Sequence, residues 1–124
     1  MKKIYVAGPY SNQDPDIIER NVETAIEYAE KIAELGYAPF VPHLFHAWDK
    51  KFKHDYEFWM TLDIEFLKVC DGIFMIPGES PGADREETFA LYELELPNFK
   101  TIEDLDKFDW IKHKKMLDSV KKPI

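Results

Sequence analysis

Apolar residues occur along the chain in two patterns. Residues 4–7 and 73–76 are short, continuous apolar runs, and a glycine or proline follows each, which is typical of buried parallel strands. From residue 16 to 35 the apolar positions recur at steps of three and four, and this spacing predicts an amphipathic helix. Gly36 is a natural residue to end it.

The rest of the chain continues this alternation. Residues 37–42 predict a second strand, and its two prolines place it near a sheet edge. Residues 43–55 are rich in aromatic, histidine and lysine residues and predict a long loop, a feature often functional in compact domains. The remaining predictions are helices over 56–70, 84–94 and 103–120 and a fourth strand over 98–102. The run Thr101-Ile102-Glu103-Asp104 resembles a capping box at the start of the last helix.

Strands that alternate with helices indicate an α/β fold with a parallel sheet and right-handed crossovers. The length of 124 residues fits a single domain over 1–124. In such sheets a ligand binds beyond the carboxyl ends of the strands. The loops at that edge begin at Gly8, Pro42 and Pro77.

Charge and composition narrow the function classes. The chain carries 16 basic and 24 acidic residues and a net charge of −8, which disfavours a nucleic acid polymer as partner. It contains no apolar run long enough for a membrane span. The single cysteine, Cys70, excludes an internal disulfide. The first residues lack the features of a signal peptide, so we expect a cytoplasmic protein.

Asp63 is the first candidate for chemistry. Its neighbours on the predicted helix face are Trp59, Leu62, Phe66 and Leu67. A carboxyl group in such surroundings is partly desolvated, which raises its pKa and suits a proton donor. The alternative is an ordinary solvated carboxylate on a helix surface.

Glu86 is the second candidate. It lies one turn into the helix that follows Gly78, Pro81 and Gly82. Glycines let the backbone approach a ligand closely, and Ser80 adds a hydroxyl group in the same loop. The alternative is a carboxylate that merely complements the helix dipole.

His43, His46 and Trp48 follow the second strand. No third ligand or rigid element accompanies the two histidines, so we expect no metal site. Hydrogen bonding to a bound ring, or stacking on it, is the role we predict for these three residues. The glycine fingerprints of kinases and dehydrogenases are absent. Two carboxyl groups without a metal motif favour cleavage of a glycosidic bond.

Several motifs follow one another along the chain. They are Tyr5-Val6-Ala7-Gly8-Pro9, the helix residue Asp63, Cys70-Asp71-Gly72-Ile73, and Ser80-Pro81-Gly82-Ala83 with Glu86 and Ala90. Together they resemble the nucleoside 2-deoxyribosyltransferase superfamily. That superfamily includes the 2′-deoxynucleoside 5′-phosphate N-hydrolases, and the chain looks most like its small phage and prokaryotic members. The resemblance covers roughly residues 3 to 104 in order.

The resemblance implies a flavodoxin-like three-layer sandwich with a small, mainly parallel sheet of four or five strands. It implies homodimers or larger assemblies, and no cofactor. By residue, it implies that Glu86 attacks the anomeric carbon, that Asp63 assists the departing base and that Tyr5 lies beside the nucleophile. Gly8, Pro9, Ser80 and Gly82 then belong to the substrate-binding loops.

The resemblance does not decide whether the substrate carries a 5′-phosphate. Ser80 stands where the phosphate-dependent hydrolases have a serine, which favours a 5′-monophosphate. The first loop has Pro9 and Ser11 where those hydrolases have a serine and an arginine, and Arg20 is a candidate substitute. The predicted reaction is hydrolysis or base exchange on a (deoxy)nucleoside or its 5′-monophosphate. The alternatives are a non-catalytic nucleotide-binding or sensor module and an interaction protein that uses residues 45–58.

Overall fold

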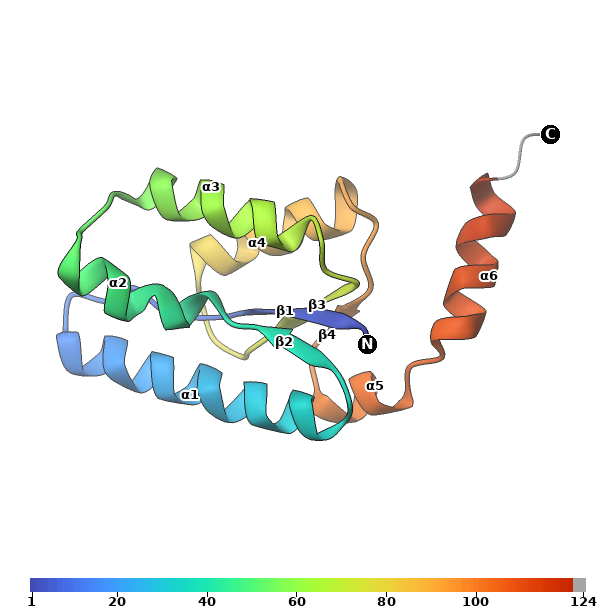
Figure 1. The fold of residues 1–124 in the computed structure, drawn as a ribbon, viewed down its shortest axis with the longest axis horizontal. Coiled ribbons are helices and arrows are strands. Elements are labelled where there is room, and N and C mark those ends of the chain that lie inside the picture. The colour runs from blue at the N-terminus through green and yellow to red at the C-terminus, as the bar shows by residue number, and fades with distance from the viewer. Residues whose placement is uncertain (122–124) are drawn as a thin grey trace.

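A parallel sheet of four strands forms the middle layer of the molecule (Figure 1). The structure is a computed structural model, and it describes residues 1–121. The sheet runs in the order β2-β1-β3-β4, and every neighbouring pair is parallel. The strands are β1 (Lys3–Ala7), β2 (Ala38–Phe40), β3 (Gly72–Met75) and β4 (Asn98–Phe99). The flavodoxin-like α/β fold and the edge position of β2 are thereby confirmed.

Helices cover both faces of the sheet (Figure 1). α1 (Pro15–Glu34) and α5 (Ile102–Lys107) pack on one face, and α3 (Tyr56–Leu67) and α4 (Pro81–Tyr92) on the other. Successive side chains of a strand point to opposite faces. In β1, Ile4 and Val6 therefore join the core on the α1 side, whereas Tyr5 and Ala7 join the core on the α4 side. This alternation directs Tyr5 toward α4.

Residues 43–55 are not the long loop that the sequence predicts. They contain a 3₁₀ turn, η1 (Pro42–Phe45), and a short helix, α2 (His46–Lys51). Proline is well suited to begin a helical turn, because its missing N–H would have no partner there. The Phe45 ring also stacks on Trp59 of α3 at a centroid distance of 5.5 Å. Tertiary aromatic contacts thus stabilise a segment whose own pattern does not predict a helix.

The helix predicted over 103–120 is also wrong, because the structure divides it into α5 and α6 (Trp110–Lys121). Phe108 is extended, with ψ 131°, and its ring packs on Phe99 at 5.0 Å. The Asp109 side chain then accepts a hydrogen bond from the Lys112 N–H at 2.9 Å and starts a new helix. Burial of Phe108 outweighs the helical continuity that the sequence pattern favours.

The start of α4 bears directly on the candidate site. The helix begins at Pro81, three residues before the predicted start, because the Ser80 hydroxyl accepts a hydrogen bond from the Ala83 N–H at 3.1 Å. The same type of cap begins α5 at Thr101, as the capping-box pattern predicts. No helix within residues 1–121 has the length and apolar character needed to cross a bilayer.

Candidate active site

A cavity of about 500 Å³ lies where the loops after β1, β2 and β3 meet. This is the edge at which parallel α/β sheets bind ligands. Eight of the ten residues that the sequence singles out line this cavity: Gly8, Pro9, His43, His46, Asp63, Ser80, Gly82 and Glu86. The two carboxyl groups, far apart in the chain, therefore face one space.

The other two residues, Tyr5 and Trp48, are not among the lining residues. Tyr5 is fully buried, and its hydroxyl donates a hydrogen bond to Glu86 Oε2. Trp48 is 41% exposed, and its ring packs edge-on against Trp59 at 5.0 Å. Its place in the structure therefore gives no support to stacking of Trp48 on a bound ring.

Glu86 is only 6% exposed. Burial raises the pKa of its carboxyl group, which reaches about 8. The hydrogen bond from Tyr5 acts in the opposite direction, and the charge of Asp63 raises the pKa further. At pH 7 the free protein therefore holds Glu86 largely protonated.

Asp63 has no hydrogen-bond partner for its buried Oδ1 among the described residues. Burial raises the pKa of this carboxyl group to about 7, as its apolar neighbours in the sequence predict. Because the charge of Asp63 disfavours ionisation of Glu86, the two carboxyl groups titrate as a pair. A pair of this kind can hold one proton between a nucleophile and a proton donor.

Close backbone packing at Gly8 shapes the floor of the cavity. A Cβ atom at Gly8 would lie 2.7 Å from the Cβ of Ile76, a distance that real side chains do not tolerate. Gly78 has a φ of 127°, a conformation that glycine adopts readily. These two glycines bring the loops after β1 and β3 together at the cavity.

His43 presents an unused acceptor. The imidazole is 4% exposed, and its Nε2 lies 3.0 Å from the carbonyl oxygen of Pro9. A carbonyl only accepts, so Nε2 carries the hydrogen and Nδ1 keeps its lone pair. The buried Nδ1 has no partner among the described residues. Burial also lowers the pKa of His43, which favours the neutral form of the ring.

His46 connects the cavity wall to α1. Its Nε2–H donates to Glu19 Oε1 at 2.9 Å, and its Nδ1 accepts from the Tyr10 hydroxyl at 2.7 Å. Tyr10 and Trp59 line the cavity, although the sequence did not single them out as site residues. Two signals were available: Tyr10 directly follows Gly8-Pro9, and Trp59 lies four residues before Asp63 on the same helix face.

Comparison with known proteins places the chain in a family. Residues 2–94 match the family model described as "Domain of unknown function (DUF7768)". The chain belongs to this family. No curated protein matches the DUF7768 chain.

Among solved structures, the DUF7768 chain is similar to a 2-deoxyribosyltransferase from the psychrotolerant bacterium Bacillus psychrosaccharolyticus. The two share 20% sequence identity with a TM-score of 0.59, and the match covers 89% of this chain and 94% of that one. The likeness shows that the two proteins have the same fold.

The charges around the cavity of this DUF7768 protein are mostly acidic. Lys53 is the one lysine or arginine among the described residues that line it, and Asp49 and Glu79 add to the carboxyl groups of Asp63 and Glu86. Across residues 1–121, no three His, Cys, Asp or Glu side chains are placed to hold a metal ion together. The cavity also offers carboxyl, imidazole and hydroxyl groups, which suit proton transfer and nucleophilic attack.

Proposed function

We propose that this DUF7768 protein cleaves the N-glycosidic bond of a (deoxy)nucleoside or its 5′-monophosphate. One observation carries the proposal: the buried carboxyl group of Glu86 and the half-buried carboxyl group of Asp63 line one cavity, and each has a raised pKa. Paired carboxyl groups are the means by which proteins commonly cleave glycosidic bonds. The fold shared with a 2-deoxyribosyltransferase adds support.

The reaction starts from the form of the pair in which the shared proton lies on Asp63 and Glu86 is ionised. In the first half of the reaction, ionised Glu86 attacks the anomeric carbon of the sugar. A bond forms from carboxylate oxygen to carbon as the bond from carbon to the base nitrogen breaks. The electron pair of the broken bond leaves with the base, and protonated Asp63 donates its proton to that base. Tyr5 holds Glu86 in place through its hydrogen bond.

In the second half, water or a second base attacks the anomeric carbon of the glycosyl ester. The carbon–oxygen bond to Glu86 breaks and restores the carboxylate. Asp63, now ionised, accepts the proton that the attacking group loses. Two displacements at the same carbon retain the configuration of the sugar.

The other lining residues supply binding groups. Nδ1 of His43, which has no partner in the described part of the chain, accepts a hydrogen bond from a substrate hydroxyl or N–H group. Ser80 and Gly82 border the cavity at the start of α4, where the helix dipole favours an electronegative group on the substrate. Gly8 and Pro9 border it at the end of β1.

Incubation with a panel of deoxynucleosides, ribonucleosides and their 5′-monophosphates tests the proposal, with the free base measured by chromatography. Glu86→Gln should lower base release by at least about a thousandfold, because the nucleophile is lost. The adjacent Glu87→Gln is the matched control, since Glu87 bonds to Lys100 and does not border the cavity. Full activity of Glu86→Gln would exclude Glu86 as the nucleophile.

A non-catalytic nucleotide-binding module is the second candidate. The observation that favours it is the pKa of Glu86 of about 8, because a protonated carboxyl group donates a hydrogen bond and does not attack carbon. Calorimetric titration separates the two functions. Binding without release of base, at pH 7 and also at pH 9, would establish the binding module.

A further inference from the structure

A chain of three hydrogen-bonded side chains ends at the wall of the candidate active site. Tyr10 follows β1, and it lines the cavity together with His46, the first residue of α2. The Tyr10 hydroxyl lies 2.7 Å from Nδ1 of His46, and Nε2 of the same ring lies 2.9 Å from Oε1 of Glu19 on α1. Two helices and the loop after β1 therefore build this chain together.

The direction of these hydrogen bonds is fixed from the Glu19 end. Hydrogen bonds from His46 and Lys50 lower the pKa of Glu19, so its carboxylate stays ionised and can only accept. Nε2 of His46 must then carry the hydrogen, and Nδ1 of the neutral ring keeps its lone pair. The Tyr10 hydroxyl therefore donates to Nδ1. Burial raises the pKa of Tyr10 to about 12, which keeps this hydroxyl protonated.

The oxygen of the Tyr10 hydroxyl is left as an acceptor. Its own hydrogen is used by His46, and no residue within 1–121 donates a hydrogen bond to it. The tyrosine is also held in place, because Asn21 of α1 donates to the Tyr10 carbonyl at 3.0 Å. The rings of His43 and His46 meet the Tyr10 ring edge-on, at centroid distances of 6.0 and 5.6 Å. An acceptor fixed in this way loses little freedom when a ligand binds.

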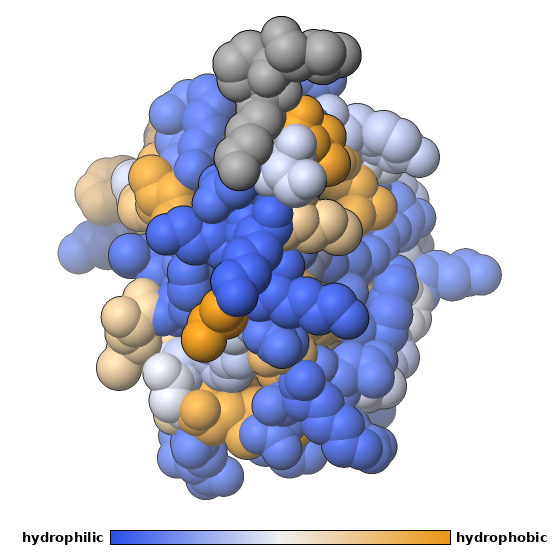
Figure 2. All heavy atoms as spheres, turned by 90° about the vertical axis from the view of Figure 1, so that its right-hand side faces the viewer, coloured by the Kyte–Doolittle hydropathy of each residue, from blue (hydrophilic) through white to orange (hydrophobic). Residues whose placement is uncertain are grey.

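The hydroxyl of Tyr37 shows the contrast. It donates to the Leu105 carbonyl at 3.1 Å and accepts from Nε1 of Trp110 at 2.7 Å, so the chain uses it both as donor and as acceptor. Trp110 begins α6, and Figure 2 shows the α6 end of the molecule, where hydrophobic patches interrupt a mainly hydrophilic surface. The Tyr37 hydroxyl thus serves the fold.

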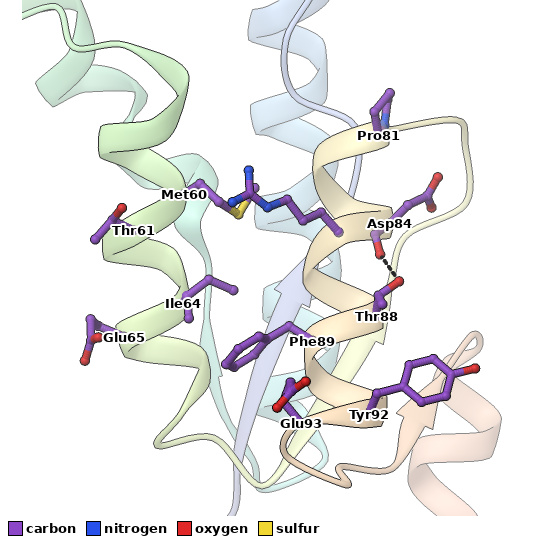
Figure 3. Close-up of a pocket in the computed structure, with 11 residues that line it drawn as sticks. Met60, Thr61, Ile64, Glu65, Pro81, Asp84, Thr88, Phe89, Tyr92 and Glu93 are labelled. Carbon is purple, nitrogen blue, oxygen red and sulfur yellow. Dashed lines mark hydrogen bonds between the residues drawn. The ribbon is translucent and has the colours of Figure 1, made fainter.

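The groove between α3 and α4 borders the cavity but offers a ligand less direction. Figure 3 shows Met60 and Phe89 pointing into the space between the two helices. The hydrogen bond drawn there runs from the Thr88 hydroxyl to the Asp84 carbonyl at 2.9 Å, and it lies within α4. A few well-placed polar groups orient a ligand in a site, and the Tyr10 oxygen supplies such a group to the cavity.

We propose that the Tyr10 oxygen selects substrates that present a hydrogen-bond donor, either a sugar hydroxyl or an amino group of the base. His46 and Glu19 are positioning residues that keep this oxygen an acceptor. The inference rests on the proposed function, since it takes a nucleoside as the ligand. A substrate without the donor would leave the Tyr10 oxygen unpaired. A phosphate group is disfavoured at this point, because its ionised oxygens only accept and the charge of Asp49 also acts on Tyr10.

Calorimetric titration tests the selection, in the Glu86→Gln background so that no base is released during the measurement. The parent ligands are 2′-deoxyadenosine and 2′-deoxycytidine, and each is compared with analogues that lack the 3′-hydroxyl, the 5′-hydroxyl or the amino group. Loss of the donor that Tyr10 recognises should weaken binding about tenfold. Tyr10→Phe should abolish that penalty for the same analogue, whereas the matched control Tyr37→Phe should keep it.

The outcomes of the titration separate this inference from the proposed function. If nucleosides bind and Tyr10→Phe keeps every penalty, the selection by Tyr10 is wrong and the proposed function stands. If neither parent nucleoside binds, both are overturned. The analogue whose penalty disappears in Tyr10→Phe identifies the recognised group as a sugar hydroxyl or the amino group of the base.

Nitrogen-15 magnetic resonance of the imidazole rings tests the hydrogen-bond direction without any ligand. At pH 8 the wild type should show His46 as the Nε2–H tautomer, with its signals identified by their loss in His46→Gln. Glu19→Ala removes the acceptor, so the Nδ1 signal should shift toward the protonated position. Glu23→Ala, one turn further along α1, is the matched control and should leave the spectrum unchanged. An Nδ1–H tautomer in the wild type, or an unchanged Nδ1 signal in Glu19→Ala, would overturn the proposal.

Discussion

Replacing Glu86 by glutamine should make the protein more stable, although it removes the proposed nucleophile. Glutamine keeps nearly the same shape, and its carbonyl oxygen still accepts the hydrogen bond from Tyr5. The difference is that glutamine has no charge to lose on burial. The folded protein raises the pKa of Glu86 from 4.5 to about 8, chiefly through that burial.

The size of the effect follows from proton linkage. Between pH 4.5 and about 8 the folded protein binds the Glu86 proton while the unfolded chain has released it, so the free energy of unfolding falls as the pH rises. Each unit of pKa difference corresponds to about 1.4 kcal/mol. The cost of keeping Glu86 is then about 1 kcal/mol at pH 5, about 3 kcal/mol at pH 7 and about 5 kcal/mol above pH 9.

Urea unfolding of the wild type and Glu86→Gln from pH 5 to pH 9 measures this difference. The gain in the variant should grow with pH, and at pH 7 it should raise the melting temperature by about 10 °C. Glu87→Gln should act in the opposite direction by less than about 1 kcal/mol, because the hydrogen bond from Lys100 lowers the pKa of Glu87. Equal stability of wild type and Glu86→Gln across the whole pH range would refute the buried, protonated state of Glu86.

Three further changes test other parts of the site. Tyr5→Phe removes the hydrogen bond that lowers the pKa of Glu86. The rise of base release with pH should therefore move at least about one unit toward alkaline pH. An unchanged pH profile would show that Tyr5 does not affect the ionisation of the nucleophile. Asp63→Asn should slow base release by about a hundredfold or more, and most for bases that leave poorly without a proton; equal losses across a series of bases would argue against proton donation by Asp63. Gly8→Ala should destabilise the fold by about 1 to 3 kcal/mol, measured by urea unfolding, because its Cβ would lie 2.7 Å from the Cβ of Ile76; a neutral effect would show that the loop relaxes.

The strands that carry the site were predictable from local pattern. β1 and β3 are continuous apolar runs followed by glycine or proline, and each lies in the middle of the sheet. Edge strand β2 carries the proline that marks an edge. Connectivity alone places Gly8 and Glu86 at one edge of the sheet. Gly8 lies at the end of β1, and Glu86 follows the glycine-containing loop after β3.

The segment between β2 and α3 was less predictable. Its aromatic residues suggested contact with a ligand. Phe45 does line the cavity, whereas Trp48 packs against Trp59 and is not among the lining residues. Aromatic side chains contact one another as readily as they contact a bound ring, so their presence alone does not tell which contact they make. That packing turned an expected loop into α2 and left Trp48 at the surface.

By itself, the sequence determined the alternation of strands and helices and the residue types available for chemistry. Hydrophobic periodicity and helix capping depend on residues that are close together in the chain, so they can be recognised from the spacing of residue types in the sequence. Only the tertiary structure brought Asp63 and Glu86 into one cavity and turned Tyr5 toward Glu86. It also left Nδ1 of His43 without a partner within residues 1–121. Burial and long-range contact decide a pKa or a hydrogen-bond partner, and these depend on segments that lie far apart in the chain.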